Sequence, residues 1–135
     1  MTDQTQTSPA TTTGLLLFAH GARDPHWALP FQAVAARCRA QRGEHRVALA
    51  FLEFTAPGLV EAGSALVAAG CTAVDVVPLF LGAGGHVRKD IPLLMAQVQA
   101  AHPTVRFRLR PAVGEAAALI EAMAAVALAD VEPRP

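Results

Sequence analysis

Short apolar runs alternate with helix-like segments along most of the chain, and this alternation is the feature that most limits its fold. Residues 14–19 are continuously apolar, as is typical of a strand buried on both faces of a parallel sheet. Further strand-like runs occupy residues 46–52, 73–80 and 105–109, and a stretch with helical spacing of apolar residues follows each run. The order β-α-β-α-β-α-β-α predicts a three-layer α/β domain. Its four-stranded parallel sheet would have right-handed crossovers and helices on both faces.

Local signals mark the ends of the predicted helices. Asp24 followed by Pro25 predicts a helix start, because a carboxylate can cap the first turn and proline suits the first helical position. The same reasoning places helix starts at Pro57 and Asp90, with Pro92 in the first turn, helix ends at Gly43, near Gly70 and near His102, and a last alanine-rich helix over about residues 115–129. The glycine-rich segment before Asp90 is therefore expected to be a loop. Alternating arginines in residues 105–109 predict an edge strand with one wet face.

The length of 135 residues fits a single domain. Because 53% of the residues are apolar, the chain has enough apolar surface for a full core. Residues 1–13 are polar, rich in threonine and without periodicity. We therefore expect a disordered tail over residues 1–13, one folded domain over residues 14–129, and a second disordered tail over residues 130–135.

Charge and residue usage argue against several classes of function. Eleven acidic residues balance eleven basic ones, whereas a protein that binds nucleic acid normally has a basic excess. No apolar run approaches the roughly 20 residues that span a bilayer, and no basic residue precedes Arg23 as in a secretory signal. Cys38 and Cys71 have no CxxC spacing, so we expect both to be reduced residues that pack in the interior of a cytoplasmic protein. From the balanced charge and the short apolar runs, we expect neither a nucleic-acid nor a membrane partner. No serine lies in a GxSxG motif, so a serine nucleophile is not expected.

Three side chains that bind metals well follow three of the predicted strands. His20 comes directly after the first strand, Glu53 ends the second, and His86 lies in the loop after the third. Because the carboxyl ends of parallel strands meet at one edge of the sheet, these residues are expected to converge there. Two imidazoles and a carboxylate suit Fe(II), Co(II), Ni(II) or Zn(II) and leave coordination positions open. The sequence therefore predicts that His20, Glu53 and His86 are both the metal site and the catalytic residues.

The glycine-rich loop before His86 matches neither GxGxxG nor GxxxxGK[ST]. We expect Gly84 and Gly85 to let the backbone approach a flat ligand, although a phosphate site remains an alternative. Arg88 and Lys89 follow at once and are candidates to bind carboxylates of that ligand. The other histidines are assigned lesser roles: His26 a supporting position near the site, and His45 and His102 the surface.

Three segments of the chain resemble a known family. They are LLLFAHGARDP, AFLEF with a following proline, and VPLFLGAGGHVRKDIP. Over about residues 14–128 the chain resembles the small class II chelatases of tetrapyrrole biosynthesis, the short CbiX-like cobaltochelatases and ferrochelatases that act on sirohydrochlorin. The family's motif histidines fall on His20 and His86, and its glutamate falls on Glu53. The first motif usually reads His-Gly-Ser, whereas Ala22 stands at its third position here.

The resemblance implies a metal chelatase (a lyase) that inserts a divalent metal, with Co²⁺ favoured, into sirohydrochlorin during cobalamin or sirohaem biosynthesis. It implies no organic cofactor, because the metal is itself a substrate, and a homodimer that places the macrocycle in a cleft. Arg23, Arg88 and Lys89 would then bind carboxylates of the tetrapyrrole. Three alternatives remain at this point: the same chemistry with Fe²⁺ or Ni²⁺, a non-catalytic metal or tetrapyrrole carrier, and a phosphate- or nucleotide-binding protein.

Overall fold

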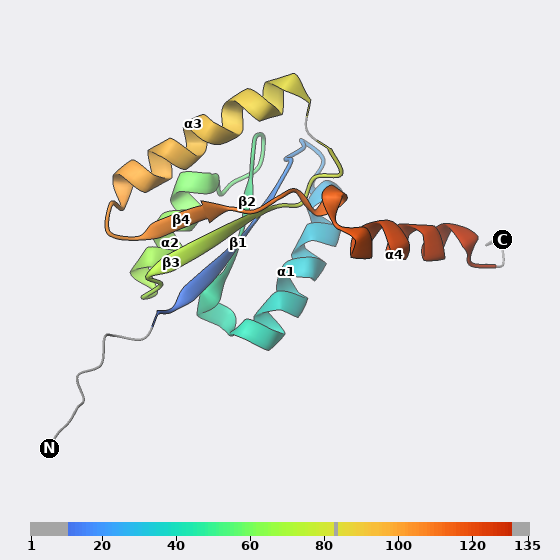
Figure 1. Cartoon of the computed structure of the whole chain (residues 1–135), viewed down its shortest axis with the longest axis horizontal. Coiled ribbons are helices and arrows are strands. Elements are labelled where there is room, and N and C mark those ends of the chain that lie inside the picture. The colour runs from blue at the N-terminus through green and yellow to red at the C-terminus, as the bar shows by residue number, and fades with distance from the viewer. Residues whose placement is uncertain (1–10, 83, 131–135) are drawn as a thin grey trace, which may run out of the picture.

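A computed structural model describes residues 11–82 and 84–130, and within this part the side chain of His86 is not described. Its centre is a four-stranded parallel sheet in the order β2-β1-β3-β4. The strands are β1 (Thr13–Ala19), β2 (Val47–Phe51), β3 (Ala73–Pro78) and β4 (Arg106–Leu109). The parallel sheet expected from the apolar runs is confirmed. The strand β2 lies on one side of β1, whereas β3 and then β4 lie on the other side, so the strand order reverses at β1 (Figure 1).

Helices cover both faces of this sheet. The helix α1 (Leu29–Arg42) lies on one face, and α2 (Leu59–Ala68) and α3 (Gly85–Ala101) lie on the other (Figure 1). Short 3-10 turns are η1 (Pro25–Ala28), η2 (Glu44–Arg46) and η3 (Val113–Glu115), and the last helix is α4 (Ala117–Leu128). The three-layer α/β architecture is therefore confirmed.

The central strand β1 supplies both halves of the core, because successive side chains point to opposite faces of a sheet. Leu16 and Phe18 are fully buried among residues of α2 and α3. Leu17 and Ala19 are buried on the opposite face, where α1 packs. The continuous apolar run of β1 thus follows from burial on both sides.

The predicted start of the first helix is confirmed. Asp24 accepts a hydrogen bond of 2.9 Å from the backbone N–H of His26, and Pro25 takes the first position of η1, which continues into α1. Gly43 ends α1 with φ +104°, a conformation that favours glycine.

The predicted start of the third helix is wrong. Helix α3 begins at Gly85 instead of Asp90, and Pro92 lies inside it. The backbone N–H of Arg88 already bonds the carbonyl of Gly84 at 3.0 Å. Val87 and Ile91, four residues apart, are both buried against the core, and we infer that this burial outweighs the backbone hydrogen bond that Pro92 cannot donate. As a consequence, His86, Arg88 and Lys89 belong to the first turns of a helix and not to a loop.

The ends of the domain also differ from expectation. Thr13 already belongs to β1, and Thr12 exchanges hydrogen bonds with Thr72, so the ordered domain begins before residue 14. Residues 1–10 and 131–135 lie outside the described part, and their disorder stays a prediction. In the part of the chain that is described, no helix is long and apolar enough to cross a membrane.

The helix α4 projects from the body of the domain and covers neither face of the sheet (Figure 1). None of its residues is buried, although its sequence is almost entirely apolar. Among its large side chains, the exposed fraction is 57% for Ile120, 47% for Met123 and 75% for Val126. Among residues 11–82 and 84–130, no element therefore buries the apolar surface of α4.

Candidate functional site

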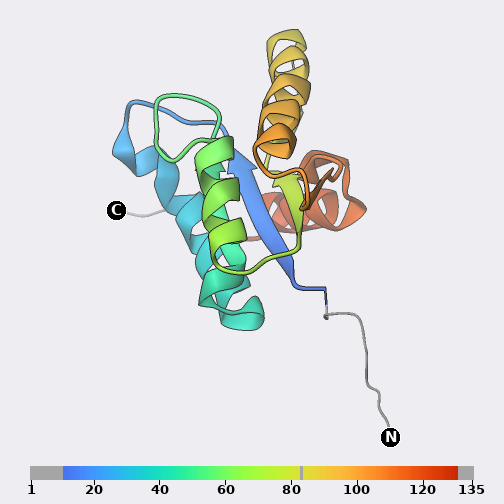
Figure 2. The ribbon, with the colours of Figure 1, turned by 90° about the vertical axis from the view of Figure 1, so that its left-hand side faces the viewer.

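The loops after β1 and β2 lie side by side at the end of the sheet where these two strands finish (Figure 2). Hydrogen bonds extend the parallel pairing to the base of these loops. Leu52 donates its backbone N–H to the carbonyl of Ala19 at 2.8 Å, and Leu79 donates to that of Phe18 at 2.7 Å. His20 is the next residue of the central strand, and therefore lies where β2, β1 and β3 all end.

His20 is held from two sides. Its ring lies against that of Phe80, with 4.3 Å between the centroids and 30° between the planes. Its backbone carbonyl accepts a hydrogen bond of 2.9 Å from the indole N–H of Trp27. The side chain is half-buried and so remains open to solvent on one side. An imidazole supported by an apolar ring and open to solvent is able to bind a ligand.

The residue after His20 brings the first two loops into direct contact. A Cβ atom built on Gly21 would lie 1.5 Å from the carbonyl oxygen of Glu53, so only glycine allows the two backbones to approach this closely. In addition, the hydroxyl of Thr55 donates to the carbonyl of Ala22 at 3.1 Å. Glu53 itself is exposed, two residues after the end of β2. The expectation that His20 and Glu53 come from neighbouring strand ends is therefore met at the level of the backbone.

The first turn of α3 carries the remaining predicted residues. The backbone of His86 lies in this turn, while its side chain lies outside the described part, as does all of Ala83. No group of three or more His, Cys, Asp or Glu side chains converges among the side chains that the structure describes, and that of His86 is not one of them. The metal site of His20, Glu53 and His86 consequently remains a prediction.

The glycines before α3 have conformations that other residues adopt. Gly84 caps the helix with φ −72°, and a Cβ built on Gly84 or Gly85 would meet no atom within 4 Å. Packing among the described residues therefore does not require glycine at these two positions. Arg88 and Lys89 are exposed.

Two further residues at this end were not singled out from the sequence as a pair. Arg23 lies over the ring of Phe54, 5.1 Å from its centroid, and Phe54 is 62% exposed. The available signal in the sequence was an aromatic residue directly after Glu53 in a chain that has only 5% aromatics.

The sequence assigns lesser roles to His26 and His102, and each has a side-chain partner in the structure. The Nδ1 of His26 lies 3.1 Å from the carboxylate of Asp24, and both side chains are strongly exposed. The surface assignment of His102 is wrong: it is half-buried, and its Nε2 lies 2.7 Å from the hydroxyl of Ser64.

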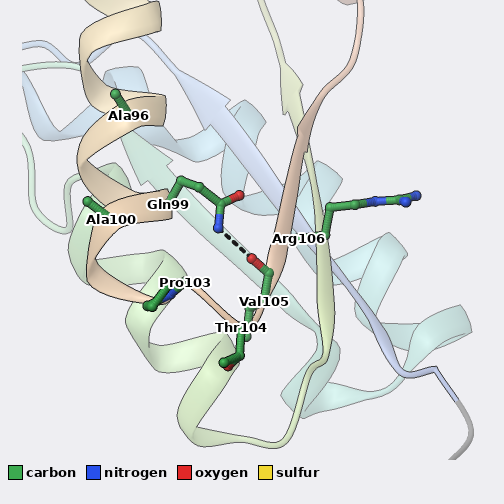
Figure 3. A pocket seen from close by; sticks show the side chains of 7 residues that line it. All are labelled: Ala96, Gln99, Ala100, Pro103, Thr104, Val105 and Arg106. Atoms are coloured by element: carbon green, nitrogen blue, oxygen red, sulfur yellow. Dashed lines mark hydrogen bonds between the residues drawn. The ribbon is translucent and has the colours of Figure 1, made fainter.

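A surface groove lies elsewhere, between the end of α3 and the start of β4 (Figure 3). Gln99 crosses this region and donates its side-chain amide to the carbonyls of Val105, at 2.7 Å, and of His102, at 3.2 Å. The residues that line the groove are Ala96, Gln99, Ala100, Pro103, Thr104, Val105 and Arg106. Since none of them is a histidine, cysteine or carboxylate, this groove is not the predicted metal site.

The fold is an open parallel α/β sheet, with an imidazole and a carboxylate on adjoining loops at the point where strand order reverses. The sequence model of the CbiX family matches residues 14–128. The chain belongs to the CbiX family.

Solved structures agree with this assignment. A putative cobalamin biosynthesis CbiX protein from Marinobacter aquaeolei superposes with a TM-score of 0.75 at 31% identity, over 85% of this chain and 93% of that one. The sirohydrochlorin chelatase SirB from Bacillus subtilis subspecies spizizenii, solved in complex with cobalt, gives a TM-score of 0.73 at 26% identity. That match covers 83% of this chain and 48% of SirB.

Curated relatives point the same way. The sirohydrochlorin cobaltochelatase of Methanothermobacter thermautotrophicus is 35% identical over 82 residues, and that of Saccharolobus solfataricus is 38% identical over 84 residues. Each match covers 61% of this chain, and the matches span 57% and 62% of the two relatives, so the chain aligns with about three fifths of their length.

Proposed function

We propose that this protein inserts a divalent metal ion, with Co²⁺ favoured, into sirohydrochlorin or a related tetrapyrrole. The observation that carries the proposal is the contact of Gly21 with Glu53, which joins the loop of His20 to that of the carboxylate in a member of the CbiX family. The names of the curated relatives support the choice of sirohydrochlorin and cobalt. Family membership also favours chelation over the phosphate-binding alternative.

The chemistry of insertion assigns different tasks to the two described side chains. The incoming ion must lose part of its water shell, and the macrocycle must lose two N–H protons as its four nitrogens bind the metal. The imidazole of His20 would bind the ion, because it is open to solvent yet fixed against Phe80. Glu53 would complete the ligand set or accept a pyrrole proton. His86 would add the second imidazole from the first turn of α3.

The start of α3 would contribute to substrate binding. Gly84 and Gly85 have open space around them, which would let a flat macrocycle approach the backbone. Arg88 and Lys89 of α3, together with Arg23 of the loop after β1, would bind the carboxylates of the substrate. No organic cofactor enters this scheme, and a cytoplasmic location stays a prediction.

The test is anaerobic insertion of Co²⁺, Fe²⁺ and Ni²⁺ into sirohydrochlorin, followed by absorbance. His20→Ala and Glu53→Gln are each expected to lower the rate at least tenfold without loss of the fold by circular dichroism. His45→Ala and Glu44→Gln are matched controls, because both residues are exposed and belong to η2, before the amino end of β2. Absence of turnover with all three metals would reject the enzyme and favour a carrier, and wild-type rates in His20→Ala would reject the site.

We further propose that the active form is a homodimer in which α4 contacts a second copy of the chain. Leu119, Ala122, Met123, Val126 and Ala127 recur at the spacing of one helix face and line an apolar hollow there. An isolated helix of about 12 residues is marginal in water, so α4 needs a partner to be stable. Its one acidic side chain, Glu121, lies on the opposite face, and the two alanines allow close approach.

Sedimentation equilibrium at micromolar concentration tests the dimer. Ala122→Glu places a charge within the apolar face and is expected to give monomers with little activity. Ala125→Glu makes the same change on the other side of α4 and is expected to leave the dimer intact. A fully active wild-type monomer, or a dimer that survives Ala122→Glu, would refute this arrangement.

A further inference from the structure

Phe54 has a backbone conformation that is unfavourable for its own side chain. Its φ of +65° makes it the only residue other than glycine with positive φ in the described part of the chain. This region is open to glycine and, for a bulky residue, is an outlier that costs free energy. The ring is also 62% exposed, so packing against the core does not repay that cost. Packing in the core of the described part of the chain therefore accounts neither for the strained backbone of Phe54 nor for the exposure of its ring.

The surrounding loop holds Phe54 firmly in this position. The residue before it, Glu53, has its carbonyl against Gly21, and the residue after it, Thr55, donates its hydroxyl to the carbonyl of Ala22 at 3.1 Å. A second bond of 2.8 Å joins the backbone N–H of Thr55 to the carbonyl of Glu53 across Phe54 itself. The ring is therefore exposed to solvent on a turn that these hydrogen bonds hold in place.

Arg23 adds a positive charge to this ring. Its guanidinium carbon lies 5.1 Å from the ring centroid, within the range of a cation–π contact. The two residues thus offer an apolar aromatic face and a guanidinium side by side. That combination matches a flat conjugated ligand whose rim carries carboxylates.

We propose that Phe54 and Arg23 form a binding platform for the tetrapyrrole, in which the ring stacks on the macrocycle and the guanidinium binds a rim carboxylate. The proposal rests on the proposed function and adds Phe54 to the same site as the partner of Arg23, since Phe54 directly follows Glu53 and Arg23 is three residues beyond His20. It explains why a strained and exposed aromatic side chain stands at this position. The platform fixes the orientation of the substrate and takes no part in proton or metal transfer.

The experiment measures the affinity of metal-free sirohydrochlorin through quenching of Trp27, the single tryptophan of the chain. Phe54→Gly removes the ring and relieves the strained backbone. It is expected to weaken binding at least tenfold while the melting temperature stays level or rises. Phe54→Tyr is expected to retain the affinity, and Phe54→Leu, which is apolar but not aromatic, to lose most of it. Val34→Ala, at an exposed valine on α1, controls for loss of exposed apolar surface and is expected to bind normally.

Arg23 is tested in the same assay. Arg23→Ala is expected to raise KM and the dissociation constant several-fold with little change in kcat, and to weaken the dependence of binding on salt. Arg23→Lys is expected to restore part of the affinity, because it keeps the charge but not the planar fork.

The outcomes separate the platform from the proposed function. A wild-type protein that neither binds sirohydrochlorin nor inserts metal would reject the proposed function. A wild-type protein that does both, with unchanged affinity in Phe54→Gly and Phe54→Leu, would reject the platform alone. A lower melting temperature in Phe54→Gly would overturn the strain argument, and the comparison of Phe54→Leu with Phe54→Tyr would then decide whether the ring stacks on the substrate.

Discussion

The contact between Gly21 and Glu53 leads to a quantitative expectation for Gly21→Ala. The added methyl group would lie 1.5 Å from the Glu53 carbonyl oxygen, whereas ordinary contacts begin near 3.4 Å, so the backbones must separate by about 2 Å. Overpacking of this kind costs about 1–3 kcal/mol, and loss of the bond from Thr55 to Ala22 adds about 1 kcal/mol. We therefore expect the free energy of unfolding to fall by about 3 kcal/mol.

Urea denaturation monitored by circular dichroism measures this loss, and Gly82→Ala is the control, because a Cβ built there meets no atom within 4 Å. The control is expected to stay within about 0.5 kcal/mol of the wild type. In the folded fraction of Gly21→Ala, metal insertion is expected to slow roughly 100-fold, since a displacement of about 1 Å at a reacting centre has that effect. Stability within 0.5 kcal/mol of the wild type would show that the loops yield without cost and would refute the steric argument.

Three smaller predictions concern the scaffold. Burial raises the pKa of the Cys71 thiol, against the opposing effect of the Arg46 charge, so the thiol ionises at a lower pH in the unfolded chain than in the folded one. The free energy of unfolding should therefore fall above about pH 9, and should fall less in Cys71→Ala. Urea titrations at several pH values measure both. Gln99→Ala should cost about 2–3 kcal/mol by thermal unfolding, because its side-chain amide donates to the carbonyls of His102 and Val105 and accepts from the backbone N–H of Phe107 in β4. Asp75→Ala should cost about 1 kcal/mol, and less in 1 M salt, because it leaves Arg108 and Arg110 without the carboxylate that they share.

The sequence by itself determined the sheet and the strand-end residues. Apolar runs and helical spacing are local patterns whose period follows from backbone geometry, so the four strands and their parallel direction could be predicted before any contact was known. The positions of His20 and Glu53 followed from the same logic, because a residue that directly follows a parallel strand lies at the carboxyl edge of the sheet.

Tertiary contacts decided the rest. The start of α3 was misplaced because proline is a local signal for a helix start, whereas burial of Val87 and Ile91 is a long-range gain that extends the helix back to Gly85. The contact of Gly21 with Glu53 joins residues 32 positions apart, and no local pattern encodes it. The same holds for Phe54, whose loop is fixed by the hydrogen bond that Thr55 donates to the neighbouring loop at Ala22. Sequence periodicity reports which face of an element is buried, whereas only the packed structure shows which loops meet beyond the ends of the strands.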